Sequence, residues 1–416
     1  MSRFRTPAVT AGPTLLLAVG LAVATSATAV SAPAAGVDPA TGPDYEMPFL
    51  CGEAWTGTSR SYHSPSFYSI DWNRPDDYGH PLLAAAPGVV TRVVPDGSTG
   101  YGRYAIIDHG AGRSTLYAHM KQTWLVEGMT IDQSQPVGFL GDTGNVTGPH
   151  LHFEERLNGT DVPAYFHRTT FRMNTTQTST SCPDTPVSGD WNGDGRTDLG
   201  VFHRTATGSV FRRLVGTTTT TVAFGTGWDR VFTGDWNGDG TAEVGVRPPG
   251  STVFVKRRTN GTLTKKSYGS VVALPLAGDW DGNGTAQLGV WRPDLHRFAL
   301  RGGDGDGVNT YRIFGSDGDL PLAGDWNGDG QDDLGVYRPS TRSFLMRRIA
   351  ANGTASTTTV ALGVAGDLPV IGDWNGDRID DLGVWSPTKA VFTLRYVARG
   401  TTVATTKTVA YGAKRG

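Results

Sequence analysis

Hydrophobic and polar residues alternate in short runs along most of this chain, and glycine-rich turns separate the runs. Between residues 49 and 170 the clearest runs are GVVTRVV (88–94), YAIIDHG (104–110) and TLYAHM (115–120). Alternation with a period of two is typical of half-buried β-strands, and long stretches with the period of an amphipathic helix are missing. The pattern therefore predicts an all-β protein with many turns.

The chain from Cys182 onward is an internal repeat. Its copies begin at Gly189, Gly234, Gly278, Gly324 and Gly372 and read GDWNGDGRTDLGVF, GDWNGDGTAEVGV, GDWDGNGTAQLGVW, GDWNGDGQDDLGVY and GDWNGDRIDDLGVW. The period is 44 to 48 residues, which is typical of propellers and solenoids. About four short strands fit each copy, such as LGVF (199–202), SVFRRLV (209–215), TTVAFG (220–225) and RVFTG (230–234).

Four strands per copy are the content of one propeller blade. We therefore expect a small antiparallel β domain followed by a β-propeller of about five four-stranded blades. In this interpretation the TPVSG strand (185–189) closes the ring by joining the last blade. An open array of sheets is the alternative.

The N-terminal segment has the pattern of a signal peptide. Two arginines precede an apolar run (15–24) that is too short to span a bilayer, and Ala27-Thr28-Ala29 fits the small-residue rule for cleavage. We expect residues 1–35 to be removed, with cleavage near residues 29–35, and the mature chain to be secreted without a membrane segment. An uncleaved membrane anchor is the alternative.

Composition divides the mature chain into three regions. Residues 36–173 hold seven of the nine histidines, residues 174–183 form a Thr/Ser/Asn-rich stretch that we interpret as a linker, and residues 184–416 carry the repeats. The only two cysteines, Cys51 and Cys182, bracket the first region, and an even number in an exported chain predicts one disulfide. A net charge of −2 argues against a nucleic-acid partner, and we expect a monomer.

The histidine-rich region contains a candidate metal centre. His63 and Asp71 lie in YHSPSFYSIDW, His119 lies in LYAHM, and His150 and His152 lie in GPHLHFE. Residues two apart on a strand project to the same face, so both imidazoles of the HLH sequence point into one space. Adding Asp71 and His63 gives a set of three ligands, two nitrogens and one oxygen, which is the composition of a catalytic zinc centre that keeps its fourth position open for water.

These motifs resemble a known family. The segment from about 50 to 165 resembles the lysostaphin-like peptidoglycan endopeptidases, which include the β-lytic and LytM-type enzymes. The matching stretches are HSPSFYSID, AAAPGVVTRV, IIDHGAGRSTLYAHM and GFLGDTGNVTGPHLHFE. The resemblance implies a small antiparallel β core with a groove, a catalytic Zn²⁺ ion and bacterial cell-wall peptidoglycan as the substrate.

The resemblance also assigns roles to residues. His63, Asp71 and His152 match the zinc ligands, and His119 and His150 match the two catalytic histidines. By this assignment His150 takes the proton of the zinc-activated water, and His119 donates a hydrogen bond to the oxyanion or protonates the leaving amine.

One spacing departs from the family pattern. Many members have HxxxD, but here seven residues separate His63 from Asp71, and the residue four before Asp71 is Phe67, which cannot bind zinc. The longer spacing resembles the β-lytic branch, so His63 remains the candidate and His80 is the fallback.

Other polar residues of this region have more ordinary interpretations. We expect His109 to be a turn or packing residue, and Tyr117 and Asn145 either line the groove or lie in the core. Glu154 and Glu155 follow the HLH strand. A solvated charge is the default for both, and the alternative is that a glutamate orients a ligand histidine.

The repeat loops follow the pattern D-x-[ND]-x-[ND]-[GR]-x-x-[DEQ], with oxygen side chains at positions 1, 3, 5 and 9. Together with a position-7 carbonyl, which is that of Arg196 in the first copy, these hard ligands predict Ca²⁺ binding. The position-12 glutamate of a helical calcium loop is replaced by Val201, so the loops resemble the FG-GAP/VCBS type. The candidate ligands are Asp190, Asn192, Asp194, Asp198, Asp235, Asn237, Asp239, Glu243, Asp279, Asp281, Asn283, Asp325, Asn327, Asp329, Asp333, Asp373, Asn375, Asp377 and Asp381.

The five loops differ in how well they match a calcium-binding loop. The third ends in the neutral Gln287 and should bind calcium more weakly, and the fifth has Arg378 where glycine is expected, which strains the turn. Metal-free Asx turns are the alternative for all loops. A tryptophan recurs at loop position 2, and we expect packing between blades, with a sugar-stacking ring as the alternative; these residues are Trp191, Trp236, Trp280, Trp326 and Trp374.

Three functions remain open. The first is an endopeptidase that cuts cell-wall peptides and carries the repeats as a targeting or stability module, which binds a carbohydrate or surface polymer. The second is a catalytically inactive wall-binding protein or lectin-like adhesin. The third is a peptidase that acts on extracellular proteins. The complete His/Asp set favours an enzyme.

Overall fold

The computed structural model describes residues 41–59, 66–182, 184–205, 208–303, 309–349 and 354–414. The predicted signal peptide lies outside these residues, and so does His63. Within these ranges the chain is built from β-strands, with short turns such as the 3-10 turn η2 (Pro293–Leu295), so the all-β prediction is confirmed. None of the helices in these ranges has the length and apolar character needed to cross a bilayer.

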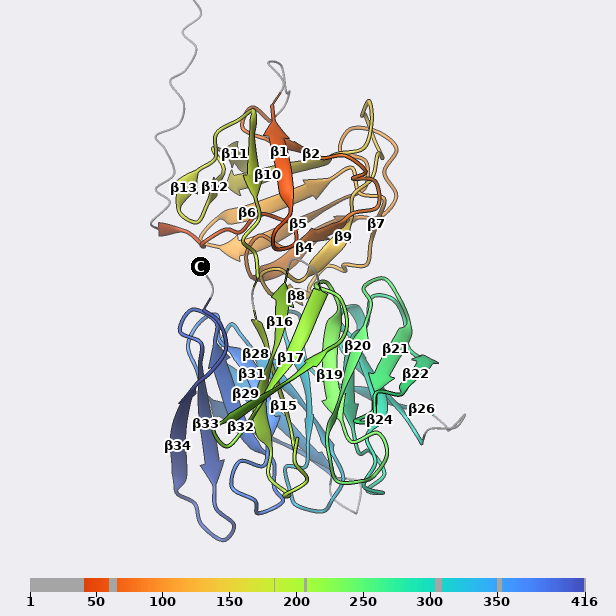
Figure 1. Ribbon diagram of the computed structural model, residues 1–416, viewed down its shortest axis with the longest axis vertical. Coiled ribbons are helices and arrows are strands. Elements are labelled where there is room, and N and C mark those ends of the chain that lie inside the picture. Colours follow the sequence, from red (N-terminus) through yellow and green to blue (C-terminus); the bar gives the residue numbers. More distant parts are fainter. Residues whose placement is uncertain are drawn as a thin grey trace, which may run out of the picture. The chain divides into compact units, whose positions relative to one another are not determined.

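The first part of the chain folds around a nine-stranded antiparallel sheet (Figure 1). Its strand order is β14-β1-β2-β10-β6-β5-β4-β8, and β11 pairs with β10. The strands are β1 (Ala54–Thr58), β2 (Ile70–Asn73), β4 (Gly88–Val94), β5 (Tyr104–Gly110), β6 (Arg113–Ala118), β8 (Thr130–Ile131), β10 (Leu151–Leu157), β11 (Thr160–Val162) and β14 (Thr175–Thr178). Small sheets combine β3 (Pro81–Leu83), β9 (Pro136–Phe139) and β7 (Gln122–Thr123), and β12 (Tyr165–Phe166) with β13 (Thr169–Thr170).

The segment that we expected to be a linker contains a strand of this sheet. Thr175–Thr178 form β14, which pairs with β1 from Ala54↔Thr178 to Gly57↔Thr175. Threonine-rich runs suit an edge strand because the branched side chain fits a pleated surface. The predicted disulfide between Cys51 and Cys182 is present, and it joins residues just outside this pair of strands.

Alternation along two central strands separates the core from the candidate site. In β2, Ile70 and Trp72 are part of the apolar core, so Asp71 between them faces the other side of the sheet. In β10, Leu151 and Phe153 enter the same core, and His152 therefore shares the face of Asp71. The core also contains aromatic pairs such as Phe49 stacked on Trp55, with ring centroids 3.8 Å apart.

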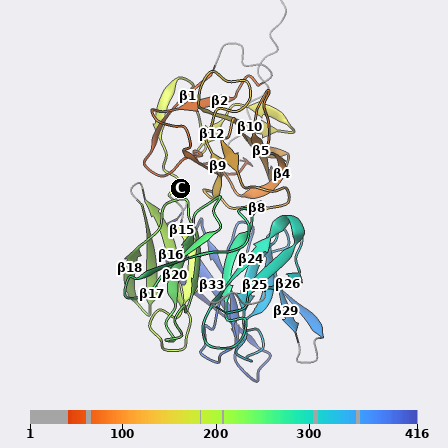
Figure 2. The same ribbon diagram turned by 90° about the vertical axis from the view of Figure 1, so that its right-hand side faces the viewer.

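The repeats form five four-stranded antiparallel sheets, each with its strands in chain order. Repeat sheet 1 contains β15 (Asp184–Gly189), β16 (Asp198–Thr205), β17 (Gly208–Val215) and β18 (Thr218–Ala223), and repeat sheet 2 contains β19 (Arg230–Gly234), β20 (Glu243–Arg247), β21 (Val253–Arg257) and β22 (Leu263–Ser267). Repeat sheet 3 contains β23 (Leu274–Gly278), β24 (Gln287–Arg292), β25 (Arg297–Arg301) and β26 (Asn309–Ile313), and Figure 2 shows the last three side by side. Repeat sheet 4 contains β27 (Leu320–Gly324), β28 (Asp333–Arg338), β29 (Ser343–Ile349) and β30 (Ala355–Ala361), and repeat sheet 5 contains β31 (Leu368–Gly372), β32 (Asp381–Ser386), β33 (Val391–Val397) and β34 (Ala404–Ala410).

The strand pairing corrects one expectation from the sequence. The TPVSG strand does not join the last sheet; it lies in β15 and pairs with β16 of its own sheet. Likewise RVFTG is β19, the first strand of repeat sheet 2, rather than the last strand of the preceding copy. The physical reason is the glycine-rich loop, which is tight enough to turn the chain back as a hairpin, so the strands before and after it become neighbours.

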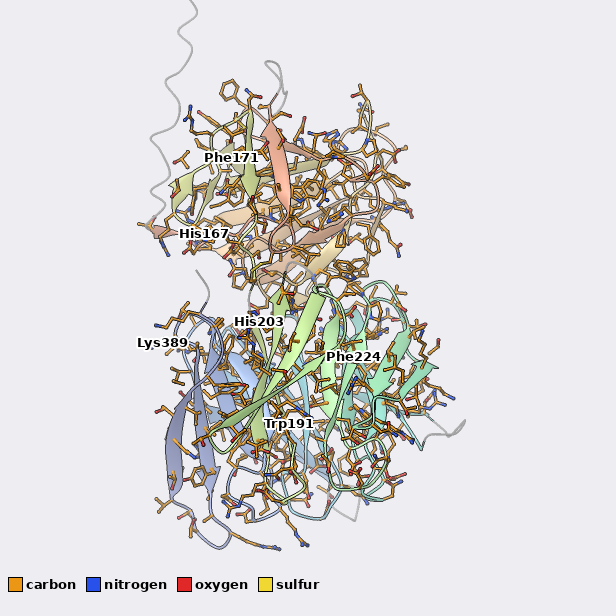
Figure 3. All side chains as sticks on the ribbon, in the orientation of Figure 1. His167, Phe171, Trp191, His203, Phe224 and Lys389 are labelled. Carbon is orange, nitrogen blue, oxygen red and sulfur yellow. A yellow bond between two sulfur atoms is a disulfide. The ribbon has the colours of Figure 1, made fainter. Side chains whose placement is uncertain are left out.

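Apolar clusters fill the spaces between successive repeat sheets. Trp191 of the first loop (Figure 3) packs with Val187 of repeat sheet 1 and Val244 of repeat sheet 2, and similar clusters follow around the repeats. The fifth cluster contains Val201 of repeat sheet 1 and Trp385 of repeat sheet 5. The loop tryptophans are buried or half-buried in these clusters, as expected for packing residues.

Backbone hydrogen bonds also connect each loop to the next. Counting the first aspartate as position 1, the position-8 N–H donates to the position-1 carbonyl of the preceding loop, as from Ala242 to Asp190 at 2.7 Å. The same bond joins loops 2 and 3, 3 and 4, and 4 and 5. Thr197 of the first loop donates to the carbonyl of Asp373 in the fifth at 2.9 Å. The first strands follow the same cycle, since β15 contacts both β19 and β31.

Candidate active site

Four of the predicted site residues lie together on one face of the nine-stranded sheet. His152 on β10 lies directly opposite Asp71 on β2, and its Nδ1 is 3.3 Å from Asp71 Oδ1. His150 Nε2 is 3.6 Å from the same carboxylate oxygen. The ring centroid of His119 is 4.8 Å from that of His150 and 5.6 Å from that of His152. The structure thus brings three imidazoles and one carboxylate to one place from three segments of the chain.

His119 directly follows β6 and is held by two carbonyl groups. Its backbone N–H donates to the Tyr101 carbonyl at 3.0 Å, and its Nδ1 lies 2.8 Å from the Thr143 carbonyl. A carbonyl only accepts, so Nδ1 carries the hydrogen and Nε2 keeps its lone pair. The residue has a φ of 60°, a left-handed conformation that is uncommon without glycine and is often found at functional sites.

His150 has the same tautomer as His119. Its Nδ1 lies 3.0 Å from the Gly148 carbonyl, so its Nε2 is also a hydrogen-bond acceptor. Burial, reinforced by the neighbouring imidazoles of His150 and His152, lowers the pKa of His119 to about 4. His119 is therefore neutral at neutral pH, and both Nε2 atoms can accept a proton or a hydrogen bond.

A buried carboxylate orients His152. Glu154, whose side chain is enclosed, lies with Oε1 2.8 Å from His152 Nε2. The same oxygen accepts a hydrogen bond from the Tyr101 hydroxyl at 2.7 Å, and Oε2 accepts one from Arg156 Nε at 2.6 Å. Burial alone would raise the pKa of Glu154, but hydrogen bonds from His152 and Tyr101 lower it to about 2. Burial alone would lower the pKa of His152, but hydrogen bonds to Asp71 and Glu154 raise it. Both carboxylates only accept, so both ring nitrogens of His152 carry a hydrogen here, and a metal ion beside Asp71 would replace the hydrogen on Nδ1.

The expectation that Glu154 and Glu155 are solvated charges is therefore wrong. Glu154 is the partner of His152, the alternative that the sequence left open. Glu155 is also buried; it accepts the N–H of Tyr165 at 3.0 Å, and burial raises its pKa well above the ordinary value. Both glutamates are enclosed because β10 lies between β2 and β6 in the middle of the sheet.

Tyr101 is a site residue that sequence reasoning missed. Its carbonyl holds the backbone of His119, its hydroxyl holds Glu154, and its ring centroid is 5.2 Å from that of His152. The adjacent Gly102, with a φ of 61°, lets this loop approach the Thr143 carbonyl so closely that an added Cβ would lie 2.3 Å from it. No local pattern around YGR connects this residue to an HLH sequence fifty positions away.

The predicted metal centre has a third ligand besides Asp71 and His152. Within the ranges that the structure covers, no three His, Cys, Asp or Glu side chains are arranged to hold a metal ion, and the third predicted ligand, His63, lies in the stretch 60–65 outside them. The donors that are described fit zinc: one carboxylate oxygen, and one imidazole nitrogen whose opposite nitrogen is held by a carboxylate, as in metal-bound histidines.

The comparison with known protein families agrees with this geometry. The model of peptidase family M23 matches residues 68–164. Residues 68–164 are an M23 peptidase domain. The match includes Asp71, His119, His150 and His152, and it leaves the repeats uncovered.

Several known proteins resemble the M23 domain. DD-carboxypeptidase/endopeptidase Mpg of Neisseria meningitidis serogroup B is 43% identical over 93 residues, 22% of this chain and 20% of that protein. Peptidoglycan DD-endopeptidase ShyA of Vibrio cholerae is 36% identical over 86 residues, 21% of this chain and 20% of that protein. This chain therefore spans about a fifth of the length of these curated relatives. A crystal structure of the catalytic domain of the M23 protein EnpA from Enterococcus faecalis is 30% identical, covering 30% of this chain and 94% of that one, with a TM-score of 0.24.

Other polar residues of the M23 domain are engaged elsewhere. His109 is a packing residue, as expected: Nδ1 is 2.8 Å from the Pro87 carbonyl, and Nε2 is 2.9 Å from Thr115 Oγ1. His80, the fallback ligand, lies against Glu53 at 2.8 Å. Tyr117 is enclosed in the core. In contrast, Asn145 is exposed.

The repeat loops are held by their own backbone. In the first loop Asp190 Oδ1 accepts the N–H of Gly193 at 2.7 Å, and Oδ2 accepts that of Gly195 at 2.8 Å. The first aspartates of loops 2, 4 and 5 accept the corresponding two backbone N–H groups. In loop 3, Asp279 accepts the N–H groups of Asn283 and Gly284. Burial, with Asp194 and Asp190 nearby, raises the pKa of Asp198 to about 6. Calcium binding by these loops remains a prediction.

The fifth loop shows the strain expected from its sequence. Arg378 has a φ of 64°, whereas the corresponding residues of the other loops are Gly195, Gly240, Gly284 and Gly330, with φ between 79° and 84°. The backbone of the loop is nevertheless the same, since the N–H of Arg378 donates to Asp373 Oδ2 at 2.7 Å. An arginine in this conformation costs free energy that glycine does not.

Proposed function

We propose that this protein is a secreted zinc metalloendopeptidase that hydrolyses peptide bonds of bacterial peptidoglycan. The observation that carries the proposal is the convergence of His119, His150, His152 and Asp71, with the Nε2 lone pairs of the first two free to accept. The names of Mpg and ShyA support peptidoglycan as the substrate class. Signal-peptide features and the disulfide support export.

The residues that would hold the zinc ion are His63, Asp71 and His152. Bound there, zinc would lower the pKa of a coordinated water toward neutrality and polarise the scissile carbonyl. The role of Glu154 is to hold His152 in the tautomer that presents Nδ1 and to raise the basicity of that nitrogen.

His119 and His150 move the protons. The attacking water forms a bond from its oxygen to the carbonyl carbon, and one imidazole Nε2 takes its proton. His150 suits this step because Asp71 lies 3.6 Å from its Nε2 and stabilises the cation formed. When the C–N bond breaks, an imidazole that carries the proton on Nε2 delivers it to the leaving amine. Neutral His119 has no hydrogen on Nε2, so it donates to an oxyanion or amine only after it is protonated.

The repeats are proposed to form a five-bladed β-propeller that serves as a targeting or stability module. The cyclic order of contacts, clusters and loop-to-loop hydrogen bonds supports this architecture. A module that binds the same polymer as the enzyme raises the local concentration of cleavable bonds.

We also propose calcium in loops 1, 2 and 4, which have full oxygen ligand sets. A cation there would relieve the repulsion between neighbouring carboxylates.

The test is mass analysis of fragments released from purified cell walls and from defined wall peptides, with and without a chelator. We expect peptide-bond cleavage that is lost with the chelator and restored by zinc. Cleavage of casein at an equal rate would favour the peptidase of extracellular proteins. Binding to walls without any released fragment, by protein loaded with zinc, would favour the inactive adhesin.

A further inference from the structure

A cleft of 440 Å³ lies between repeat sheets 2 and 3, within the range of small-molecule sites. Two aromatic residues line it, Tyr268 just after β22 and Tyr311 on β26. The Tyr268 hydroxyl donates to Asn309 Oδ1 at 3.1 Å, which joins the two sheets. The described residues of the lining include Arg292 and Arg297 and no carboxylate. The cleft is therefore polar, aromatic and positively charged.

Tyr311 is exceptional among the five repeats. It is paired with Ala299 on the neighbouring strand β25, and its side chain is 53% exposed. At the same register the other outer strands carry Thr221, Lys265, Thr359 and Thr408, opposite Arg212, Val255, Leu345 and Thr393. Only repeat sheet 3 thus combines an aromatic ring with the smallest partner. The small alanine leaves part of the ring exposed on an edge strand, where a flat ligand can pack on it.

Two polar atoms of the lining residues lack partners. Ser270 Oγ and Arg297 Nε are both buried and have no hydrogen-bond partner among the described residues. A buried donor without a partner is costly, and in native structures it often indicates an unseen ligand or water. The Arg297 guanidinium also lies 5.1 Å from the centre of the Tyr311 ring, so its charge and the aromatic ring are beside each other. Arg292, by contrast, is already paired with Asp294.

We infer that this cleft binds a sugar unit that carries a carboxylate. The apolar C–H face of a sugar ring packs on the exposed face of Tyr311, where the negative face of the aromatic ring meets weakly positive C–H groups. Arg297 donates to the carboxylate, for which its planar fork is matched, and Ser270 hydrogen-bonds a ring hydroxyl. The site would tether the protein to an acidic glycan. This inference does not rest on the proposed hydrolysis, because none of the residues that line the cleft belongs to the M23 domain.

The chain provides a matched control cleft. Between repeat sheets 5 and 1 a cleft of 580 Å³ is lined by Tyr411 and by Thr221 of β18 and Arg212 of β17. Thr221 occupies the register position of Tyr311, and Arg212 that of Ala299. The general shape of a space between sheets is therefore present in both places, but the exposed aromatic ring is present only in the first.

The experiment measures binding of the full mature chain by isothermal titration calorimetry. The main probe is the glycan strand of bacterial cell wall freed of its peptides by an amidase, which leaves a free lactyl carboxylate on alternate sugars. A neutral chitin oligosaccharide and polyphosphate are the comparison probes. Tyr311→Thr introduces the residue that three other repeats carry at this position, so the fold should tolerate it; Thr221→Ala is the control in the second cleft.

We expect the acidic glycan to bind, with affinity about tenfold weaker in Tyr311→Thr and in Arg297→Gln, and unchanged in Thr221→Ala. Cleavage of a soluble wall peptide should be equal in all variants, which separates this site from the proposed hydrolase. The inference would be overturned if the acidic glycan did not bind, or if the neutral oligosaccharide bound with equal affinity. It would also be overturned if polyphosphate displaced the glycan at an equal concentration of negative charge, or if Tyr311→Thr and Thr221→Ala lost equal affinity.

Discussion

The M23 site and the repeat loops both gather polar oxygen and nitrogen atoms, but they hold them by different means. In the M23 domain, residues from three distant segments meet, and side chains or carbonyls hold the far side of each imidazole. In a repeat loop, the first aspartate accepts N–H groups of residues three and five positions later. The loop is therefore complete through local contacts, whereas the M23 site exists only when the sheet has formed.

The two kinds of site should respond differently to the removal of metal ions. The loops satisfy their first carboxylate by backbone N–H groups, so they can fold before any ion binds. The M23 site instead directs two Nε2 lone pairs, the Nδ1 of His152 and the carboxylate of Asp71 toward one another. Removal of divalent ions should therefore affect catalysis much more than the folding of the repeats.

The largest expected effect is on catalysis. Replacement of His150 by alanine removes the proposed proton acceptor, and cleavage of wall peptides should fall by about 10²–10⁴-fold. Zinc content, measured by atomic emission after dialysis, should stay the same because His150 is not a proposed ligand. His296→Ala in the repeats, which removes a partner of Asp317, is the control with normal activity. An active His150→Ala enzyme would contradict the mechanism.

Next is the acid sensitivity of the M23 domain. Burial lowers the pKa of His109 from 6.5 to about 4, so the unfolded chain binds this proton more readily than the folded chain. The stabilisation is complete above about pH 6.5 and is lost as the pH falls towards 4, by up to about 3 kcal/mol.

The variant His109→Gln isolates this contribution. Glutamine does not titrate, so the drop in urea midpoint between pH 7.5 and pH 5 should be smaller than in the wild type. Part of the drop will remain, because the pKa of His119 is lowered in the same direction. Identical pH profiles for variant and wild type would rule out His109 as a source of acid sensitivity.

A smaller effect is expected at the carboxylate behind His152. Glu154→Gln keeps the shape but removes the charge that holds His152 Nε2, and zinc affinity should weaken about 10–100-fold. Competition with a fluorescent chelator measures it, with the melting temperature of the metal-free protein as a control for folding. Tyr101→Phe, which removes one hydrogen bond to Glu154, should change affinity in the same direction and by less. Unchanged zinc affinity in Glu154→Gln would show that the contact is only structural.

The smallest expected effect is on the stability of the repeats, through the fifth loop. Arg378→Gly places glycine at a φ of 64° and should raise the stability of the repeats by about 1 kcal/mol. Thermal unfolding in the presence of a chelator measures the change, and Gly330→Arg in the fourth loop should lower stability by a similar amount. If both variants melt like the wild type, the left-handed arginine is not strained.

Several elements were predictable because the signal is local. The runs 88–94 and 104–110 form β4 and β5 with the same bounds. The two-residue spacing in HLH correctly predicted that His150 and His152 share a face. The loop tryptophans were correctly expected to pack. In each case a few neighbouring residues decide the result through backbone periodicity or turn chemistry.

The predictions that were wrong concern features that depend on contacts between distant segments. The pairing of TPVSG with β16, the strand at 175–178 and the burial of Glu154 all depend on which distant segments become neighbours. A glutamate in a strand looks the same in sequence whether it faces water or the hydroxyl of Tyr101. Burial changes its pKa and its role, and burial belongs to the packed sheet.

The residue order along the chain was enough to specify the β class, the fivefold repeat and the histidines and aspartate of the proposed active site, because periodicity, turns and functional groups are local properties. The folded arrangement alone specified the tautomers of His119 and His150, the Glu154–Tyr101 support and the exposed ring of Tyr311. Those features come from contacts between segments tens of residues apart, where hydrogen-bond direction and exclusion of water set the behaviour of each group.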